Sequence, residues 1–198
     1  MNPLMTPNES PGPVGARRRR ARWRGGSVHA HGSLAGSYHG APRSTQDIDL
    51  VVEASIASLL EVAAELRAAG LYVSDDAILE AHSSQGMFSA IDPGSGWKID
   101  FIVRKGRPFS RAEFESRHAI EFLGLNLSIA SAEDLIVAKL EWARLGTSER
   151  QLRDVAEIIA VQGTRLNVGR IEEWTAKLEL ETEWALAREL ADSIGGSA

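Results

Sequence analysis

Two aspartates separated by one apolar residue are the residues of this chain best suited to chemistry. In Asp47-Ile48-Asp49 the two-residue period of a strand puts both carboxylates on one face, while the apolar neighbours point toward a core. Two negative charges this close need a cation to balance them. Oxygen ligands of this kind suit Mg2+ or Mn2+, which complete their coordination shells with water and substrate phosphates. The pair therefore predicts a metal site that acts on a phosphorylated substrate.

A glycine-serine turn upstream supplies what such a substrate needs. Gly32 and Ser33 follow a short predicted strand, residues 27–31, and open a predicted helix that reaches residue 39. Phosphate oxygens favour the start of a helix, where free N–H groups and the positive end of the dipole converge, and a glycine lets the backbone approach a ligand closely. We therefore expect Gly32 and Ser33 to bind nucleotide phosphates. The Gly-Ala-Pro sequence of residues 40–42 ends the helix before the aspartate strand.

The order of hydrophobic strand, Gly-Ser, helix and Asp-Ile-Asp-Leu resembles the nucleotidyltransferase superfamily that shares the polymerase-β fold. The resemblance covers about residues 32–162 and is closest to small bacterial members, including relatives of abortive-infection and toxin–antitoxin toxins. It implies an α+β fold, in which a mixed twisted sheet is flanked by helices and followed by a C-terminal helical region. The activity it implies is Mg2+-dependent transfer of a nucleoside monophosphate from a nucleoside triphosphate such as ATP to a hydroxyl, with release of pyrophosphate.

The same resemblance implies further site residues. The superfamily has a third carboxylate on a later strand, and Asp100 in Trp-Lys-Ile-Asp-Phe-Ile-Val, residues 97–103, matches it. Asp47, Asp49 and Asp100 would then be the catalytic metal ligands, and Asp100 would accept the proton of the attacking hydroxyl. Residues 132–140 resemble the segment whose lysine reaches the nucleotide phosphates, which gives that role to Lys139. The alternative for Lys139 is a half-buried helix position whose ammonium group reaches solvent.

The sequence does not decide the role of Arg43 or the identity of the acceptor. Arg43, in the loop before the aspartates, has two interpretations that the sequence does not separate: contact with phosphate, or attachment of the loop to the aspartates. A transfer RNA end, a protein hydroxyl and a small aminoglycoside-like alcohol all present the same nucleophile. A second class of function also remains, a catalytically weak binding module that partners an antitoxin protein.

Charge and composition divide the chain into three parts. Residues 1–24 hold six arginines against Glu9, so this segment carries +5 and the rest of the chain −10. Its Pro- and Gly-rich start predicts a disordered leader, and the arginines suit nucleic-acid phosphates. A third class of function is therefore a nucleic-acid binder; an inert leader is the simpler interpretation. We expect a nucleotidyltransferase core over residues 25–130 and a helical region over residues 131–198.

Composition excludes several other classes of protein. The chain has 198 residues, of which 43% are hydrophobic and 25% charged, as in an ordinary globular protein. It has no cysteine, which excludes disulfides, thiolate metal sites and a cysteine nucleophile. No apolar run approaches the roughly 18 residues of a membrane span, so we expect no membrane partner and a cytoplasmic location.

Periodicity predicts the elements that position the site. An apolar stripe from Ile56 to Leu66 predicts a helix that ends at Gly70. Two predicted hairpins follow, one joining residues 87–91 to 97–103 and one joining residues 120–123 to 125–129. Helices are then expected from Ser131, after residues 147–148, and over about residues 170–191. Trp97, Trp142 and Trp174 are expected in the core.

His29 and His31 alternate on the first predicted strand and could share a face as metal ligands. No third nitrogen ligand has a matching position in the sequence. We therefore expect no zinc site from these two residues alone.

Overall fold

The computed structural model of the chain describes residues 26–122 and 125–195. The predicted leader, residues 1–24, lies outside the described residues. The strands of the described part are β1 (Gly26–Ala30), β2 (Asp47–Ala54), β3 (Met87–Ile91), β4 (Lys98–Val103), β5 (His118–Phe122) and β6 (Leu125–Ile129). Its helices are α1 (Gly32–His39), α2 (Ile56–Ala68), α3 (Asp75–Ser84), α4 (Pro108–Ser116), α5 (Ala132–Gly146), α6 (Glu149–Gln162), α7 (Val168–Leu178) and α8 (Glu181–Gly195), with a 3-10 turn η1 (Gly163–Arg165).

The strands form one mixed sheet in the order β3-β4-β2-β1-β6-β5. β2 runs parallel to β4 and antiparallel to β1, and both predicted hairpins, β3–β4 and β5–β6, are present. The central position of β2 places the predicted aspartate strand between β1, which leads into the Gly-Ser turn, and β4, which carries Asp100. The α+β class and the mixed sheet predicted from the sequence are confirmed.

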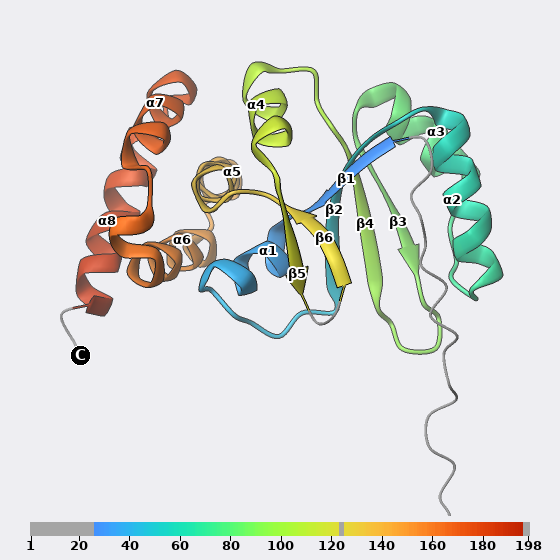
Figure 1. The fold of residues 1–198 in the computed structure, drawn as a ribbon, viewed down its shortest axis with the longest axis horizontal. Coiled ribbons are helices and arrows are strands. Elements are labelled where there is room, and N and C mark those ends of the chain that lie inside the picture. The colour runs from blue at the N-terminus through green and yellow to red at the C-terminus, as the bar shows by residue number, and fades with distance from the viewer. Residues whose placement is uncertain (1–25, 123–124, 196–198) are drawn as a thin grey trace, which may run out of the picture.

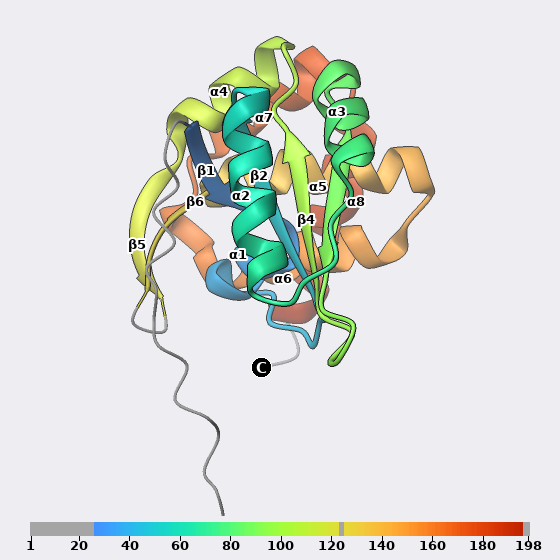
Figure 2. The same cartoon turned by 90° about the vertical axis from the view of Figure 1, so that its right-hand side faces the viewer.

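Helices cover both faces of the sheet. Figure 1 shows α2 and α3 on one side and α5 to α8 on the other, and in Figure 2 α2 and α3 lie in front of the strands. One core cluster joins α2 and α3 to Val52, Phe101 and Val103 of the strands. A second cluster joins α1 and the C-terminal helices around Leu135, and that face of the sheet also carries the aspartates.

Local sequence explains where the helices begin and end. The side chain of Ser131 accepts a hydrogen bond from the backbone N–H of Asp134 at 3.1 Å, which is the predicted cap of α5. Ser55 and Ser74 cap α2 and α3 in the same way. α1 ends at Gly40, whose φ of +123° is open to glycine and unfavourable for other residues.

Three features differ from expectation. The helix predicted over residues 170–191 is two helices, α7 and α8, because Glu179 adopts a left-handed conformation and reverses the chain so that Leu180 is buried. Trp97 and Trp142 are 44% and 61% exposed and do not belong to the core, whereas Trp174 packs against it. α3 and α4 had no clear apolar stripe in the sequence, since each buries only a few residues.

Candidate active site

The predicted carboxylates share one face of the sheet. Asp47 and Asp49 start β2, and parallel pairing puts Asp49 directly beside Asp100 of β4. Ile99, Phe101 and Val103 point to the opposite core, as the alternation of β4 requires. Asp100 is buried, Asp49 is half-buried, and the Asp47 side chain is 52% exposed. The three carboxylates therefore run from the interior to the surface along a single face.

Lys98 is a residue that the sequence reasoning missed. Its ammonium nitrogen lies 2.8 Å from Asp100 Oδ2 and 3.7 Å from Asp47 Oδ1. The hydrogen bond to Asp100 raises the pKa of Lys98 above its ordinary value, with the neighbouring aspartate charges adding to the effect. Ser89 Oγ donates to the other oxygen, Asp100 Oδ1, at 2.6 Å. A cation therefore already stands between two of the predicted metal ligands.

The Gly-Ser turn lies against Asp49. Gly32 has a φ of +52°, and a Cβ atom there would lie 1.9 Å from Asp49 Oδ2. The backbone N–H of Ser33 points to the same oxygen at 3.4 Å. The start of α1, which we predicted to bind phosphate, is thus in contact with a carboxylate of the chain itself. A side chain larger than hydrogen at position 32 cannot coexist with this placement of Asp49.

A buried polar network joins the turn to α5 and α6. Arg43 donates to the Ser33 hydroxyl, and its Nε lies 3.8 Å from Asp154 Oδ2. Lys139, predicted at the phosphates, is 4% exposed and donates to Asp154 at 2.7 Å and to Gln151 at 3.2 Å. Burial lowers the pKa of Lys139, and the hydrogen bond to Asp154 partly opposes that shift. Lys139 therefore does not reach solvent, and Arg43 holds the turn in this structure.

The donor chemistry of the carboxylate face fits a hard divalent cation. All three predicted ligands offer oxygen atoms, and Lys98 fills the role of their counter-ion. The carboxylate oxygens of these three aspartates do not all lie within 4.8 Å of one another. Among the described residues, the one group of three potential ligands that meets this limit is His29, His31 and Glu113. Metal binding would accordingly require Lys98 to withdraw and the carboxylates to draw together.

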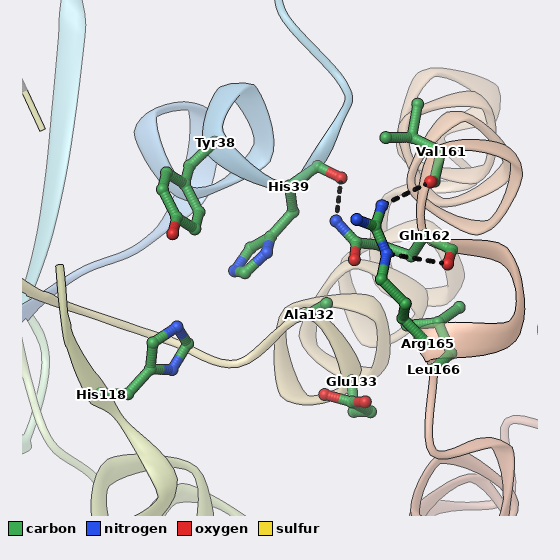
Figure 3. A pocket seen from close by; sticks show the side chains of 9 residues that line it. All are labelled: Tyr38, His39, His118, Ala132, Glu133, Val161, Gln162, Arg165 and Leu166. Atoms are coloured by element: carbon green, nitrogen blue, oxygen red, sulfur yellow. Dashed lines mark hydrogen bonds between the residues drawn. The ribbon is translucent and has the colours of Figure 1, made fainter.

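A separate pocket of about 440 Å3 lies at the other end of α1 (Figure 3). Tyr38 and His39 from α1 and His118 from β5 line it, together with residues of α5, α6 and the chain after α6. The side-chain amide of Gln162 donates to the His39 carbonyl at 2.8 Å and closes one wall. None of the seven predicted site residues lines this pocket.

Comparison with solved structures decides the fold. The solution structure of the antibiotic-resistance factor ANT(2'')-Ia aligns with a TM-score of 0.53 and 14% identity, over 79% of this chain and 84% of that one. A crystal structure of an antigenic nucleotidyltransferase-like protein from Paracoccidioides brasiliensis aligns with a TM-score of 0.51 and 15% identity, over 83% and 84% of the two chains. The chain has the nucleotidyltransferase fold.

The sequence alone shows no such relationship to known proteins: no family model matches the chain, and no curated protein matches it. The nucleotidyltransferase fold is therefore established by the arrangement of its elements. The described helices include none that is both long and apolar enough to cross a membrane.

Proposed function

We propose that the protein is a nucleotidyltransferase that uses Mg2+ or Mn2+ to transfer a nucleoside monophosphate from a triphosphate to an acceptor hydroxyl, with release of pyrophosphate. The observation that carries this proposal is the pairing of Asp49 with Asp100 on adjacent parallel strands, with Asp47 on the same face. The turn at Gly32 touches this face, so the region that suits phosphate adjoins the carboxylates.

The proposed reaction is an in-line displacement at the α-phosphorus. The acceptor oxygen forms a bond to that phosphorus, the bond from it to the oxygen bridging to the β-phosphate breaks, and pyrophosphate leaves. Bound divalent ions would neutralise charge and lower the pKa of the acceptor hydroxyl. Asp47, Asp49 and Asp100 would hold these ions. Asp100 would also take the hydroxyl proton, which requires that Lys98 first release its oxygen.

The remaining residues of the site position the triphosphate. Gly32 and Ser33 would offer backbone N–H groups to its phosphates once Asp49 turns toward a metal ion. Arg43 adds positive charge beside Ser33, and the buried Lys139 of α5 adds positive charge deeper in the protein. We propose that residues 25–130 form the catalytic core and that residues 131–198 support it through the Lys139–Asp154 pair.

The proposal is tested by following the labelled nucleotide. The protein is incubated with each α-32P-labelled triphosphate in turn, with Mg2+ and with separated RNA, protein and small-molecule fractions of a cell extract. We expect Mg2+-dependent label in one fraction, which identifies the acceptor class, and release of unlabelled pyrophosphate. Asp49→Asn should abolish labelling. Asp76→Asn, an exposed aspartate at the start of α3, is the matched control and should label normally.

Two results would overturn the proposal. Normal labelling by Asp49→Asn would remove the carboxylates from the mechanism. Tight triphosphate binding without transfer to any fraction would instead favour a binding module, such as a partner of an antitoxin protein.

A further inference from the structure

A second cluster of ligand-type side chains lies between β1 and α4. His29 lies in β1, His31 directly follows that strand, and Glu113 reaches His31 from α4. One ligand atom from each of the three lies within 4.8 Å of the others. All three side chains are buried: the residues are 1%, 9% and 7% exposed. The cluster joins two elements that are far apart in the sequence.

His29 is the unusual member of this cluster. Both of its ring nitrogens are buried, and neither has a hydrogen-bond partner among the described residues. Its ring packs at 5.2 Å from Phe114 and 5.9 Å from His31, measured between centroids. Buried polar atoms are almost always paired, because an unpaired one loses its hydrogen bonds to water without replacement. The His29 nitrogens are therefore the polar atoms of this cluster that a bound metal ion would satisfy.

The cluster differs from the carboxylate face in donor chemistry. It offers two imidazole nitrogens and one carboxylate oxygen, a set of three protein ligands that suits Zn2+ and leaves a fourth position open. Mg2+ and Mn2+ prefer oxygen ligands instead. We propose that His29, His31 and Glu113 form a transition-metal site, distinct from the aspartate site, whose best-matched ion is Zn2+.

The geometry requires only local adjustment. Zn–N and Zn–O bonds of about 2.0–2.2 Å place two ligand atoms of a tetrahedral site roughly 3.3 Å apart. His31 Nε2 and Glu113 Oε1, now 2.6 Å apart in a hydrogen bond, would separate slightly, and His29 would turn toward them. Arg117 and Arg104 lie over the Phe114 ring, 4.2 Å and 5.8 Å from its centroid, so positive charge near the cluster moderates its affinity for a cation.

An ion there would act on the neighbouring site through the backbone. The backbone N–H of His31 donates to the Asp49 carbonyl at 2.9 Å, and His31 immediately precedes Gly32. The site would tie α4 to the strand that leads into the Gly-Ser turn. It would thereby fix the position of that turn without contacting nucleotide.

The experiment uses Co2+ as a visible probe in the untagged full chain, after treatment with chelator and in a large excess of Mg2+. We expect one Co2+ per chain with the absorption bands of a four-coordinate N/O site, displaced by one equivalent of Zn2+. His29→Leu should lose these bands, with a fall in Zn2+ affinity beyond the roughly tenfold to hundredfold typical of losing an outer-shell partner.

Two controls separate this site from other histidines and from the aspartates. His118→Gln alters the His39–His118 pair, whose ring centroids are 6.2 Å apart, and should bind Co2+ like the parent. Asp49→Asn should also keep the Co2+ site, even where nucleotide transfer is lost. Thermal melts confirm that each variant is folded. Absence of stoichiometric Co2+ binding, or binding unchanged in a folded His29→Leu variant, would overturn the proposal.

Discussion

At Gly32 one hydrogen atom leaves room for the Asp49 carboxylate. A Cβ atom there would overlap Asp49 Oδ2, since the two would be 1.9 Å apart, and the φ of +52° adds backbone strain. We predict that Gly32→Ala lowers nucleotide transfer by about a hundredfold or more, the scale at which a misplaced catalytic group acts. Gly163→Ala is the control for a positive φ without a clash: its φ is +53° and nothing lies within 4 Å of the added Cβ.

Both substitutions place an alanine at a positive φ, and Gly163, with a ψ of −127°, lies outside the left-handed helical region, so its backbone strain is about 1 kcal/mol of unfolding free energy or more. Only Gly32→Ala should lose activity. Equal effects of the two substitutions on turnover would mean that Asp49 can move aside freely.

In the proposed site, Lys98 would compete with metal for Asp47 and Asp100. Removing its ammonium group from Asp47 and Asp100 should lower the stability of the metal-free protein and strengthen Mg2+ binding. We predict that Lys98→Met lowers the Mg2+ dissociation constant by about tenfold, which corresponds to about 1.4 kcal/mol. The increase of Tm with Mg2+ concentration measures it, with the exposed Lys105→Met as control. Weaker Mg2+ binding in Lys98→Met would show instead that the lysine supports the metal site.

His29 makes the stability of the metal-free protein sensitive to acid. Burial, with smaller contributions from His31 and Arg117, lowers its pKa from 6.5 to about 3. Between pH 3 and pH 6.5 His29 binds a proton in the unfolded chain but not in the folded one. The free energy of unfolding therefore falls as the pH drops below 6.5, by up to about 1.4 kcal/mol per pH unit. Above pH 6.5 His29 does not change it. His29→Leu should flatten this acid limb in urea unfolding between pH 7 and pH 5. If the stability of His29→Leu depended on pH as steeply as that of the parent and of His118→Gln, His29 would not be the cause of the acid sensitivity.

Residue patterns in the sequence indicate some of these sites and not others. The aspartates and the turn are local in sequence, so alternation and glycine placement predict their shared face. Glu113 is 82 residues from His31, so no local pattern in the sequence links this carboxylate to the two histidines. Lys98 gave a signal only in hindsight: it lies two residues before Asp100 and therefore on the same side of β4.

One buried ion pair links α5 to α6, beside the apolar residues that the two helices share in the core. Lys139 and Asp154 are both nearly inaccessible, and Arg43 is a second cation near the same carboxylate. We predict that Asp154→Leu lowers the unfolding free energy by about 3–5 kcal/mol, because it leaves Lys139 buried without its counter-ion. Lys139→Met should cost less, since Arg43 remains beside Asp154.

The double variant Lys139→Met/Asp154→Leu should recover much of the loss, because an apolar pair of similar volume can replace a buried ion pair. Urea unfolding of the four proteins gives the coupling energy directly. Strict additivity would show that the two side chains stabilise the helices independently.

Elements with a strong period were predictable, and elements with few buried residues were not. β2 and β4 each alternate between the carboxylate face and the apolar core, and α2 has a continuous stripe. α3 buries only Ile78 and Ala81, so its pattern is too weak to see. The break between α7 and α8 depends on a left-handed Glu179, a residue type that gives no such signal.

Charge is unevenly distributed over the whole molecule. Residues 1–24 carry +5 and the rest of the chain −10. We predict that a chain of residues 25–198 keeps Mg2+-dependent nucleotide turnover and loses any salt-dependent affinity for RNA or DNA. Filter binding at two salt concentrations, beside the labelling reaction, measures both. Loss of turnover on truncation would show that residues 1–24 are needed for nucleotide transfer.

Contact between Asp49 and the start of α1 would also make the two proposed ligands, metal and triphosphate, bind cooperatively. The Ser33 N–H, the group suited to phosphate, is already directed at the carboxylate of the chain. A phosphate anion can bind that N–H only when the Asp49 carboxylate moves away from it. A divalent ion coordinated by Asp49 would favour this movement. By linkage, metal and triphosphate would each strengthen the other's binding by the same factor. At the proposed site, Asp49 would thus act as an internal competitor of phosphate, and metal binding would remove that competition.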